Sequence, residues 1–142
     1  MKLVVNTNRI IAALIKDSFS RKIILHGNAE FIAIPLLDEE VKNHKQLITK
    51  KADITGVEFD ILMQKLHSKM TCINDAVVSA YMKEASALMD AIDPDDTPFI
   101  AAALATGASI WSDDKHFQQQ KNIRIYTTHE LNHFLNFVSH SS

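Results

Sequence analysis

Cysteine is nearly absent from this chain of 142 residues, which contains only Cys72. A single cysteine cannot form a disulfide within the chain or a cysteine-based zinc site, so a disulfide-stabilised scaffold is excluded and a reducing compartment is favoured. Its setting in the run Met-Thr-Cys-Ile predicts a buried position in a strand.

The chain also lacks long hydrophobic runs and a strong net charge. No apolar stretch approaches the roughly 20 residues that span a bilayer, and the N-terminal Lys-Leu-Val-Val run is too short for the core of a signal peptide. We therefore expect a soluble, cytoplasmic protein without a membrane partner. The formal net charge of −2 excludes a generally basic surface, so any contact with nucleic acid must come from local basic patches or bound cations.

What the chain does contain is 46% apolar residues in a length typical of one globular domain, and we expect a single domain over residues 1–142. Short apolar runs predict strands at residues 2–5, 31–34, 70–73, 109–111 and 123–126. Helical periodicity predicts helices at residues 10–15, 18–26, 35–51, 55–66, 75–91 and 93–106 and after residue 127. This alternation indicates an α/β fold with three layers, in which helices cover both faces of a mainly parallel sheet.

Several helix ends have recognisable signals. Thr55 with Glu58, and Thr127 with Glu130, have the spacing of capping boxes, in which a hydroxyl and a carboxylate satisfy the first backbone N–H groups of a helix. Gly107 follows an alanine-rich stretch and is expected to end that helix.

Polar side chains directly follow two of the predicted strands, namely Asn6, Ser112, Asp113 and Asp114. In an open parallel sheet, ligands bind outside the carboxyl ends of the strands. Asp96, before the fourth strand, and Glu40, after the second, can fold to the same edge. Ionised carboxylates repel one another in a small volume unless hard cations neutralise them, so we expect Mg²⁺ or Mn²⁺ there. Two such ions about 3.5–4 Å apart can bind a phosphodiester and lower the pKa of an attacking water.

Four segments together resemble the PIN-domain family, and the similarity runs over essentially the whole chain. They are LVVNTNRIIAAL at residues 3–14, DEEV at 38–41, DPDDTPFIAAALA at 93–105 and IWSDDKHF at 110–117. The resemblance implies a PIN-like fold and cleavage of RNA with Mg²⁺ or Mn²⁺. Many relatives are toxins of the VapC type, which implies a cognate antitoxin as partner. The resemblance, with the apolar helices near both ends of the chain, also leads us to expect a homodimer.

The resemblance implies four catalytic and metal-binding positions: Asn6, Glu40, Asp96 and Asp114. Asn-Thr-Asn stands at residues 6–8 where the family pattern has Asp-Thr-Asn. An asparagine carbonyl can bind a cation, but it lacks the charge of a carboxylate and cannot accept a proton from water at neutral pH. We therefore expect impaired catalysis, either because the natural protein is attenuated or because the chain carries an inactivating substitution.

Alternatives remain open at each acidic position. Glu39 competes with Glu40, Asp93 and Asp95 with Asp96, and Asp113 with Asp114, and helix capping is the simplest role for Asn6 and Asp93. Six residues are expected to contact substrate or to support the ligands: Thr7, Asn8, Arg9, Ser112, Asp113 and Lys115. His116 is the one histidine close enough to an expected ligand to contact substrate. The alternative functions are a non-catalytic PIN module that binds RNA or protein and, less well supported, a flavodoxin-like or receiver-type signalling module.

Overall fold

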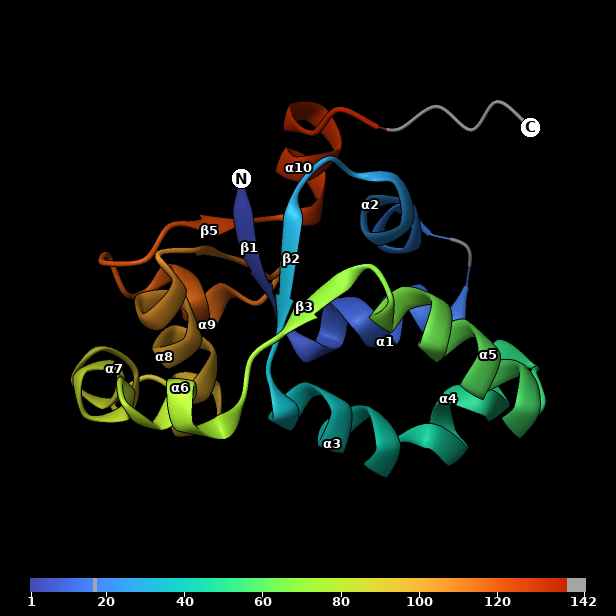
Figure 1. Cartoon of the computed structure of the whole chain (residues 1–142), viewed down its shortest axis with the longest axis horizontal. Coiled ribbons are helices and arrows are strands. Elements are labelled where there is room, and N and C mark those ends of the chain that lie inside the picture. The colour runs from blue at the N-terminus through green and yellow to red at the C-terminus, as the bar shows by residue number, and fades with distance from the viewer. Residues whose placement is uncertain (17, 138–142) are drawn as a thin grey trace.

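A parallel five-stranded sheet forms the centre of the molecule (Figure 1). The structure, a computed structural model, describes residues 1–16 and 18–137. The strands are β1 (Lys2–Val5), β2 (Glu30–Ala33), β3 (Met70–Cys72), β4 (Ser109–Trp111) and β5 (Ile125–Tyr126). Their order across the sheet is β3-β2-β1-β4-β5, and each neighbouring pair is parallel. β1 therefore lies at the centre, and the carboxyl ends of all five strands point to one edge.

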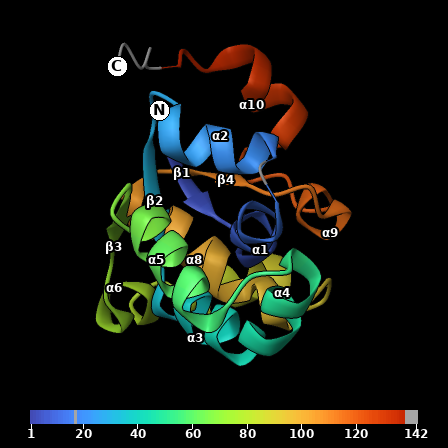
Figure 2. The same cartoon turned by 90° about the vertical axis from the view of Figure 1, so that its right-hand side faces the viewer.

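Helices cover both faces of this sheet and make a three-layer α/β/α fold (Figures 1 and 2). One face carries α1 (Thr7–Ile15), α2 (Phe19–His26), α3 (Pro35–Asn43), α4 (Lys45–Ala52), α5 (Gly56–His67) and α10 (Thr128–Phe134). The other carries α6 (Asp75–Ser79), α7 (Met82–Met89), the 3₁₀ turn η1 (Pro94–Asp96), α8 (Thr97–Thr106) and α9 (Lys115–Gln118). The predicted fold class is confirmed. Among the described residues, no helix is long and apolar enough to cross a membrane.

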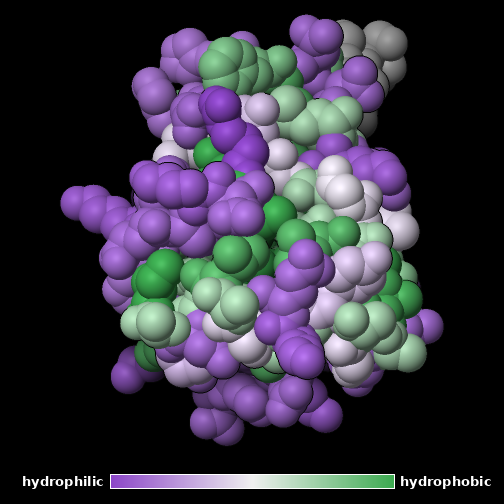
Figure 3. Space-filling view, turned by 90° about the vertical axis from the view of Figure 1, so that its left-hand side faces the viewer, coloured by the Kyte–Doolittle hydropathy of each residue, from purple (hydrophilic) through white to green (hydrophobic). Residues whose placement is uncertain are grey.

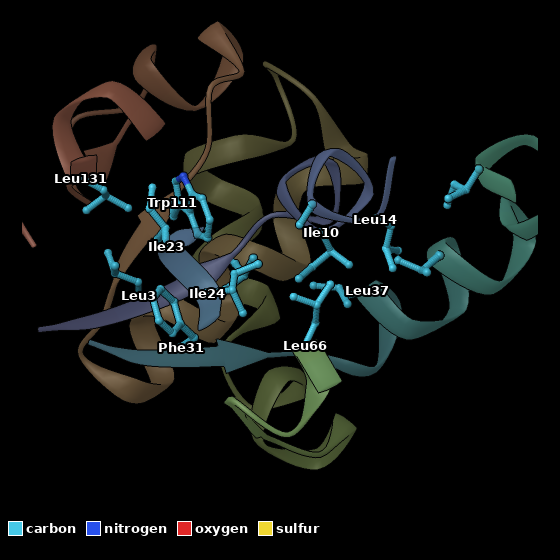
Figure 4. Packing of buried hydrophobic residues seen from close by; sticks show 14 of the residues in the cluster. Leu3, Ile10, Leu14, Ile23, Ile24, Phe31, Leu37, Leu66, Trp111 and Leu131 are labelled. Carbon is cyan, nitrogen blue, oxygen red and sulfur yellow. The ribbon is translucent and has the colours of Figure 1, made fainter. Parts of the chain in front are cut away.

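The central strands are buried on both faces, because their successive side chains point to opposite sides. Leu3 and Val5 join the core beneath α1 and α2, whereas Val4 joins the core beneath α8. Figure 4 shows the first of these cores, in which Leu3 lies near the rings of Phe31 and Trp111. The two ring centroids are 6.0 Å apart. Burial of apolar side chains from neighbouring strands thus fixes the ends of β1 and β4 relative to the helices that follow them.

The predicted helix ends are confirmed where a cap specifies them. Both capping boxes form, with Thr55 and Glu58 at the start of α5 and Thr127 and Glu130 at the start of α10. Gly107 ends α8 with a φ of 67°, a left-handed conformation that favours glycine.

Other boundaries differ from the prediction. The helix expected over residues 35–51 is broken at His44, beside Asn43, and both residue types have low helix propensity. The helix expected over 75–91 is broken between α6 and α7, and α9 was not predicted. Cys72 is exposed rather than buried, because β3 is an edge strand with one neighbour only.

The second core reaches the surface beside α7. Figure 3 shows this side of the molecule, where apolar side chains gather in a band with hydrophilic residues above and below. Met82 and Leu88 of α7 are partly buried against the second core.

Candidate active site

The ends of β1 and β4 lie side by side and bring two of the predicted site segments together. Val5 pairs with Trp111, and the backbone N–H of Asn6 donates to the Trp111 carbonyl at 3.1 Å. Ser112 and Asp113 continue from this point, so the polar residues after both strands share the carboxyl edge, as expected.

Asn6 is buried at this edge and caps α1. Its side chain is 5% exposed, and its Oδ1 accepts a hydrogen bond from the backbone N–H of Asn8 at 3.4 Å. The simplest role considered for Asn6, a helix cap, is therefore present in the structure. An aspartate could make the same cap, since the two residues are about equally effective there.

Glu40, rather than Glu39, reaches the end of β1. The buried Thr7 hydroxyl donates to Glu40 Oε1 at 2.7 Å, which holds this half-buried carboxylate one residue from Asn6. Glu39 is exposed and lines a separate surface depression with Pro35 and Pro98. The side chains of adjacent helical residues diverge by about 100°, which explains the separation.

Asp96 is the most strongly perturbed of the predicted ligands. Burial raises the pKa of the Asp96 carboxyl, and the negative charges of Asp93 and Asp114 raise it further. His116 lowers this pKa in part, and the resulting value is about 7. A hydrogen bond with the Asp93 carboxyl also favours the protonated form. The buried Oδ2 of Asp96 has no hydrogen-bond partner within residues 1–16 and 18–137. Asp96 and Asp114 are thus close enough for the charge of one to affect the other.

Two further residues, Asp93 and His116, belong to this group. The ligand atoms of Asp93, Asp96 and His116 all lie within 4.8 Å of one another. His116 Nδ1 is 3.4 Å from Asp93 Oδ2 and 3.5 Å from Asp114 Oδ1. The sequence left Asp93 as a rival of Asp96, with helix capping as its simplest role. It does act as a cap, since its Oδ1 accepts from the Asp95 N–H at 3.1 Å. The spacing of Asp93 and Asp96 across one turn was the available signal for a shared site.

Arg9 and Asp113, both expected near the substrate, are bound to each other. Arg9 Nη1 is 2.7 Å from Asp113 Oδ2. The other oxygen of Asp113 accepts from the backbone N–H of Thr128 at 2.7 Å, and the Thr128 hydroxyl donates to Oδ2 at 2.9 Å. This arrangement connects the starts of α1 and α10 to the end of β4 and gives Asp113 a structural role.

The remaining predicted residues lie at the first turns of the helices that start at this edge. The buried Ser112 accepts from the Asp114 N–H at 3.0 Å, which fixes the turn into α9. Asn8 and Lys115 are exposed at the starts of α1 and α9.

The residues at this edge suit a divalent cation in type and in charge. One group joins Asn6, Thr7 and Glu40, and the other joins Asp93, Asp96, Asp114 and His116. The second group places three carboxyls together, and one buried carboxylate oxygen in it lacks a donor among the residues that the structure describes. Cation binding would relieve both the repulsion and the missing contact.

Comparisons with known proteins bear on the family and the fold of the chain. A family described as PIN domain matches residues 4–135. Among solved structures, the chain is similar to one in the structure titled VapBC2 from Rickettsia felis bound to a DNA fragment from their promoter. The TM-score is 0.66 at 15% identity, and the match covers 89% of this chain and 98% of that chain, which shows a shared fold. No curated protein matches.

Proposed function

Because the chain belongs to the PIN-domain family, we propose that it is a metal-dependent endoribonuclease of the toxin–antitoxin type, with activity reduced by Asn6. The observation that carries the proposal is the environment of Asp96. Its carboxyl is half-buried among Asp93 and Asp114, its pKa is raised to about 7, and its Oδ2 lacks a hydrogen-bond partner among the described residues. A perturbed carboxyl at a sheet edge is typical of a functional site rather than of a packed core.

The residues proposed to hold Mg²⁺ or Mn²⁺ are Asn6, Glu40, Asp96 and Asp114. A cation bound there would neutralise the charge of a scissile phosphate and lower the pKa of an attacking water. The Thr7 hydroxyl orients Glu40 through its 2.7 Å hydrogen bond. Asn6 offers a neutral oxygen and cannot take a proton, which is the physical basis of the reduced activity.

We expect the positively charged side chains beside this edge of the sheet to bind the phosphates of the RNA. Lys115 is exposed in the first turn of α9, next to Asp114, and offers an unhindered ammonium group. Arg9 is only partly exposed and is paired with Asp113, so we assign it a weaker role toward RNA. The net charge of −2 makes such local cations necessary for any RNA contact.

The alternative is a non-catalytic PIN module that binds RNA or a protein. The observation that favours it is the cap at Asn6, because the buried side chain already has a structural partner in the Asn8 N–H. A residue kept only as a cap has no need of a charge.

We also propose an antitoxin protein as partner, a homodimer and a cytoplasmic location. A solved structure similar to this chain is titled VapBC2 bound to a DNA fragment from their promoter, which supports the antitoxin partner. A hollow of about 610 Å³ between α1 and α5 has apolar walls that include Leu14, Ile15 and Leu62. Ile61, which also lines it, is 63% exposed, and apolar side chains exposed beside a hollow are common at sites of protein binding. Light scattering over a wide concentration range tests the dimer, and a monomer throughout would contradict it.

The test of the function uses the purified protein and its Asn6→Asp variant with structured and single-stranded RNA. Each is incubated with Mg²⁺, with Mn²⁺ and with excess EDTA. We expect cleavage that needs the metal and is faster in the variant. If both forms bind RNA and neither cleaves it, the non-catalytic alternative replaces the nuclease.

A further inference from the structure

His116 lies where it can bind the same cation as the carboxylates. It belongs to the short helix α9, which Asp114 caps, since the Asp114 Oδ1 accepts a hydrogen bond from the His116 backbone N–H at 2.9 Å. This cap fixes the first turn of α9, and the imidazole then lies beside η1, with Nδ1 3.4 Å from Asp93 Oδ2.

In this group, some side-chain atoms make structural hydrogen bonds and others are available to bind an ion. Asp93 uses Oδ1 to cap η1, which leaves Oδ2 facing His116. Asp96 has a buried Oδ2 without a hydrogen-bond partner among the described residues. One carboxylate oxygen of Asp93, one of Asp96 and a ring nitrogen of His116 all lie within 4.8 Å of one another. A cation bound among them would hold the two carboxylates together.

We infer that Asp93, Asp96 and His116 form a site for one first-row transition-metal dication, Mn²⁺ or a later ion, in preference to Mg²⁺. The inference rests on the proposed metal dependence and names the ion and two added ligands, Asp93 and His116. An imidazole nitrogen suits transition metals, whereas Mg²⁺ takes oxygen ligands almost exclusively.

The rest of the carboxyl edge favours a single ion. The group of Asp93, Asp96 and Asp114 contains three carboxyls. The group of Asn6, Thr7 and Glu40 contains one, that of Glu40, which accepts a hydrogen bond from Thr7. With asparagine at position 6, that side supplies one negative charge and is poorly suited to a second dication.

The alternative role for His116 is a surface ion pair with Asp93, because its side chain is 50% exposed. An ion pair needs a proton on the imidazole of His116 and would be lost when a metal took the place of that proton. An ion pair also gives the protein no preference for one dication over another. Metal selectivity therefore distinguishes the two roles.

The experiment measures binding of Mn²⁺ and Mg²⁺ by calorimetry and, for Mn²⁺, by the electron paramagnetic resonance signal of the free ion. All proteins carry Cys72→Ser, because the exposed Cys72 thiol lies 3.3 Å from His67 Nε2 and offers a competing soft ligand. We expect one Mn²⁺ per chain, bound at least about tenfold more tightly than Mg²⁺. His116→Gln should weaken Mn²⁺ binding at least about tenfold and Mg²⁺ binding less than threefold, which corresponds to the loss of about 1.4 kcal/mol from one ligand.

Two further variants complete the design. His133→Gln, at an exposed histidine on α10, is the matched control and should leave Mn²⁺ binding unchanged. Asp93→Asn keeps an oxygen to cap η1, so it should fold and also lose Mn²⁺ affinity. Equal affinities for Mn²⁺ and Mg²⁺, or unchanged Mn²⁺ binding in either His116→Gln or Asp93→Asn, would overturn the inference.

Cleavage assays separate this inference from the proposed function. Mn²⁺ binding that depends on His116, in a protein that cleaves no RNA with or without the Asn6→Asp substitution, supports the metal site and removes the nuclease. Metal-dependent cleavage together with Mn²⁺ binding that is indifferent to His116 supports the nuclease and overturns the site.

Discussion

Asn6→Asp is the most informative substitution, because it changes charge while keeping size and the cap of α1. Asparagine and aspartate cap helices about equally well, and the helix dipole favours the anion by about 0.3–1 kcal/mol. Against this, Asn6 is only 5% exposed, and the carboxylate of Glu40 is held by the adjacent Thr7. Burial and repulsion both disfavour the charged form of the new aspartate.

The expected magnitude follows from these opposing contributions. If burial and repulsion raise the pKa of the new carboxyl by one to two units, the free energy of unfolding at neutral pH falls by about 1.4–2.7 kcal/mol. For a chain of this size that corresponds to a Tm lower by roughly 4–8 °C in EDTA. Metal at 100 times its Kd would return about 2.7 kcal/mol, so saturating Mn²⁺ should restore the Tm.

The assay compares melting curves in EDTA and in Mn²⁺ with RNA cleavage rates, for the protein and for Asn6→Asp. Asn74→Asp is the matched control, because Asn74 caps α6 in the same way, with Oδ1 3.0 Å from the Val77 N–H, but is exposed. Only the change at position 6 should lower the Tm in EDTA, enlarge the shift with Mn²⁺ and raise cleavage about tenfold or more, equivalent to 1.4 kcal/mol of barrier. Equal shifts and equal activity in all three proteins would refute a metal-binding role for position 6.

Three other perturbations test the same edge. In EDTA, the carboxyl of Asp96, with a folded pKa of about 7 against 3.8, binds more protons when folded, so stability should fall as the pH rises from about 4 to about 7. After a discount for solvent screening, we expect the free energy of unfolding, measured with urea, to fall by about 1–2 kcal/mol over this pH range in the parent protein but not in Asp96→Asn. A free energy of unfolding in the parent protein that does not change with pH would contradict this prediction. Thr7→Val keeps the buried volume but removes the hydroxyl that donates to Glu40, so it should lower the free energy of unfolding by about 1–3 kcal/mol. The same substitution should cost less in a protein that already carries Glu40→Gln. Asp113→Ala removes the acceptor of the Thr128 N–H and hydroxyl and should cost about 1–2 kcal/mol in thermal or urea unfolding; an unchanged Tm would exclude this connection as a source of stability.

The strand order at the edge of the sheet could not be predicted from local sequence. The run Leu3-Val4-Val5 is apolar at consecutive positions, as expected for a strand buried on both faces, and β1 is indeed central. Met70 to Ile73 gave a similar signal, yet Thr71 and Cys72 are exposed. Whether a strand has a second neighbour depends on how the whole chain packs, and no short apolar run contains that information.

The locations of the candidate site residues were more predictable than their contacts. A polar residue after a buried strand must lie at the carboxyl edge, so Asn6 and Ser112 could be located from the order of the elements. The pairing of Arg9 with Asp113 joins positions 104 residues apart and depends on how α1 and α10 lie against β4. Such pairs follow from helix placement and side-chain rotamers, which the spacing of residues along the chain does not determine.

Positions 6 and 116 depart from an all-carboxylate site in complementary ways. Asparagine at position 6 removes a negative charge, which weakens electrostatic attraction for any dication. An imidazole at position 116, 3.4 Å from Asp93, adds a donor that strengthens binding without adding charge, and does so only for ions that accept nitrogen ligands. A chain with both features loses attraction for Mg²⁺ and keeps it for Mn²⁺ and later ions. If this edge carries the proposed nuclease activity, the choice of metal, rather than the loss of one carboxylate alone, decides how much of that activity is retained.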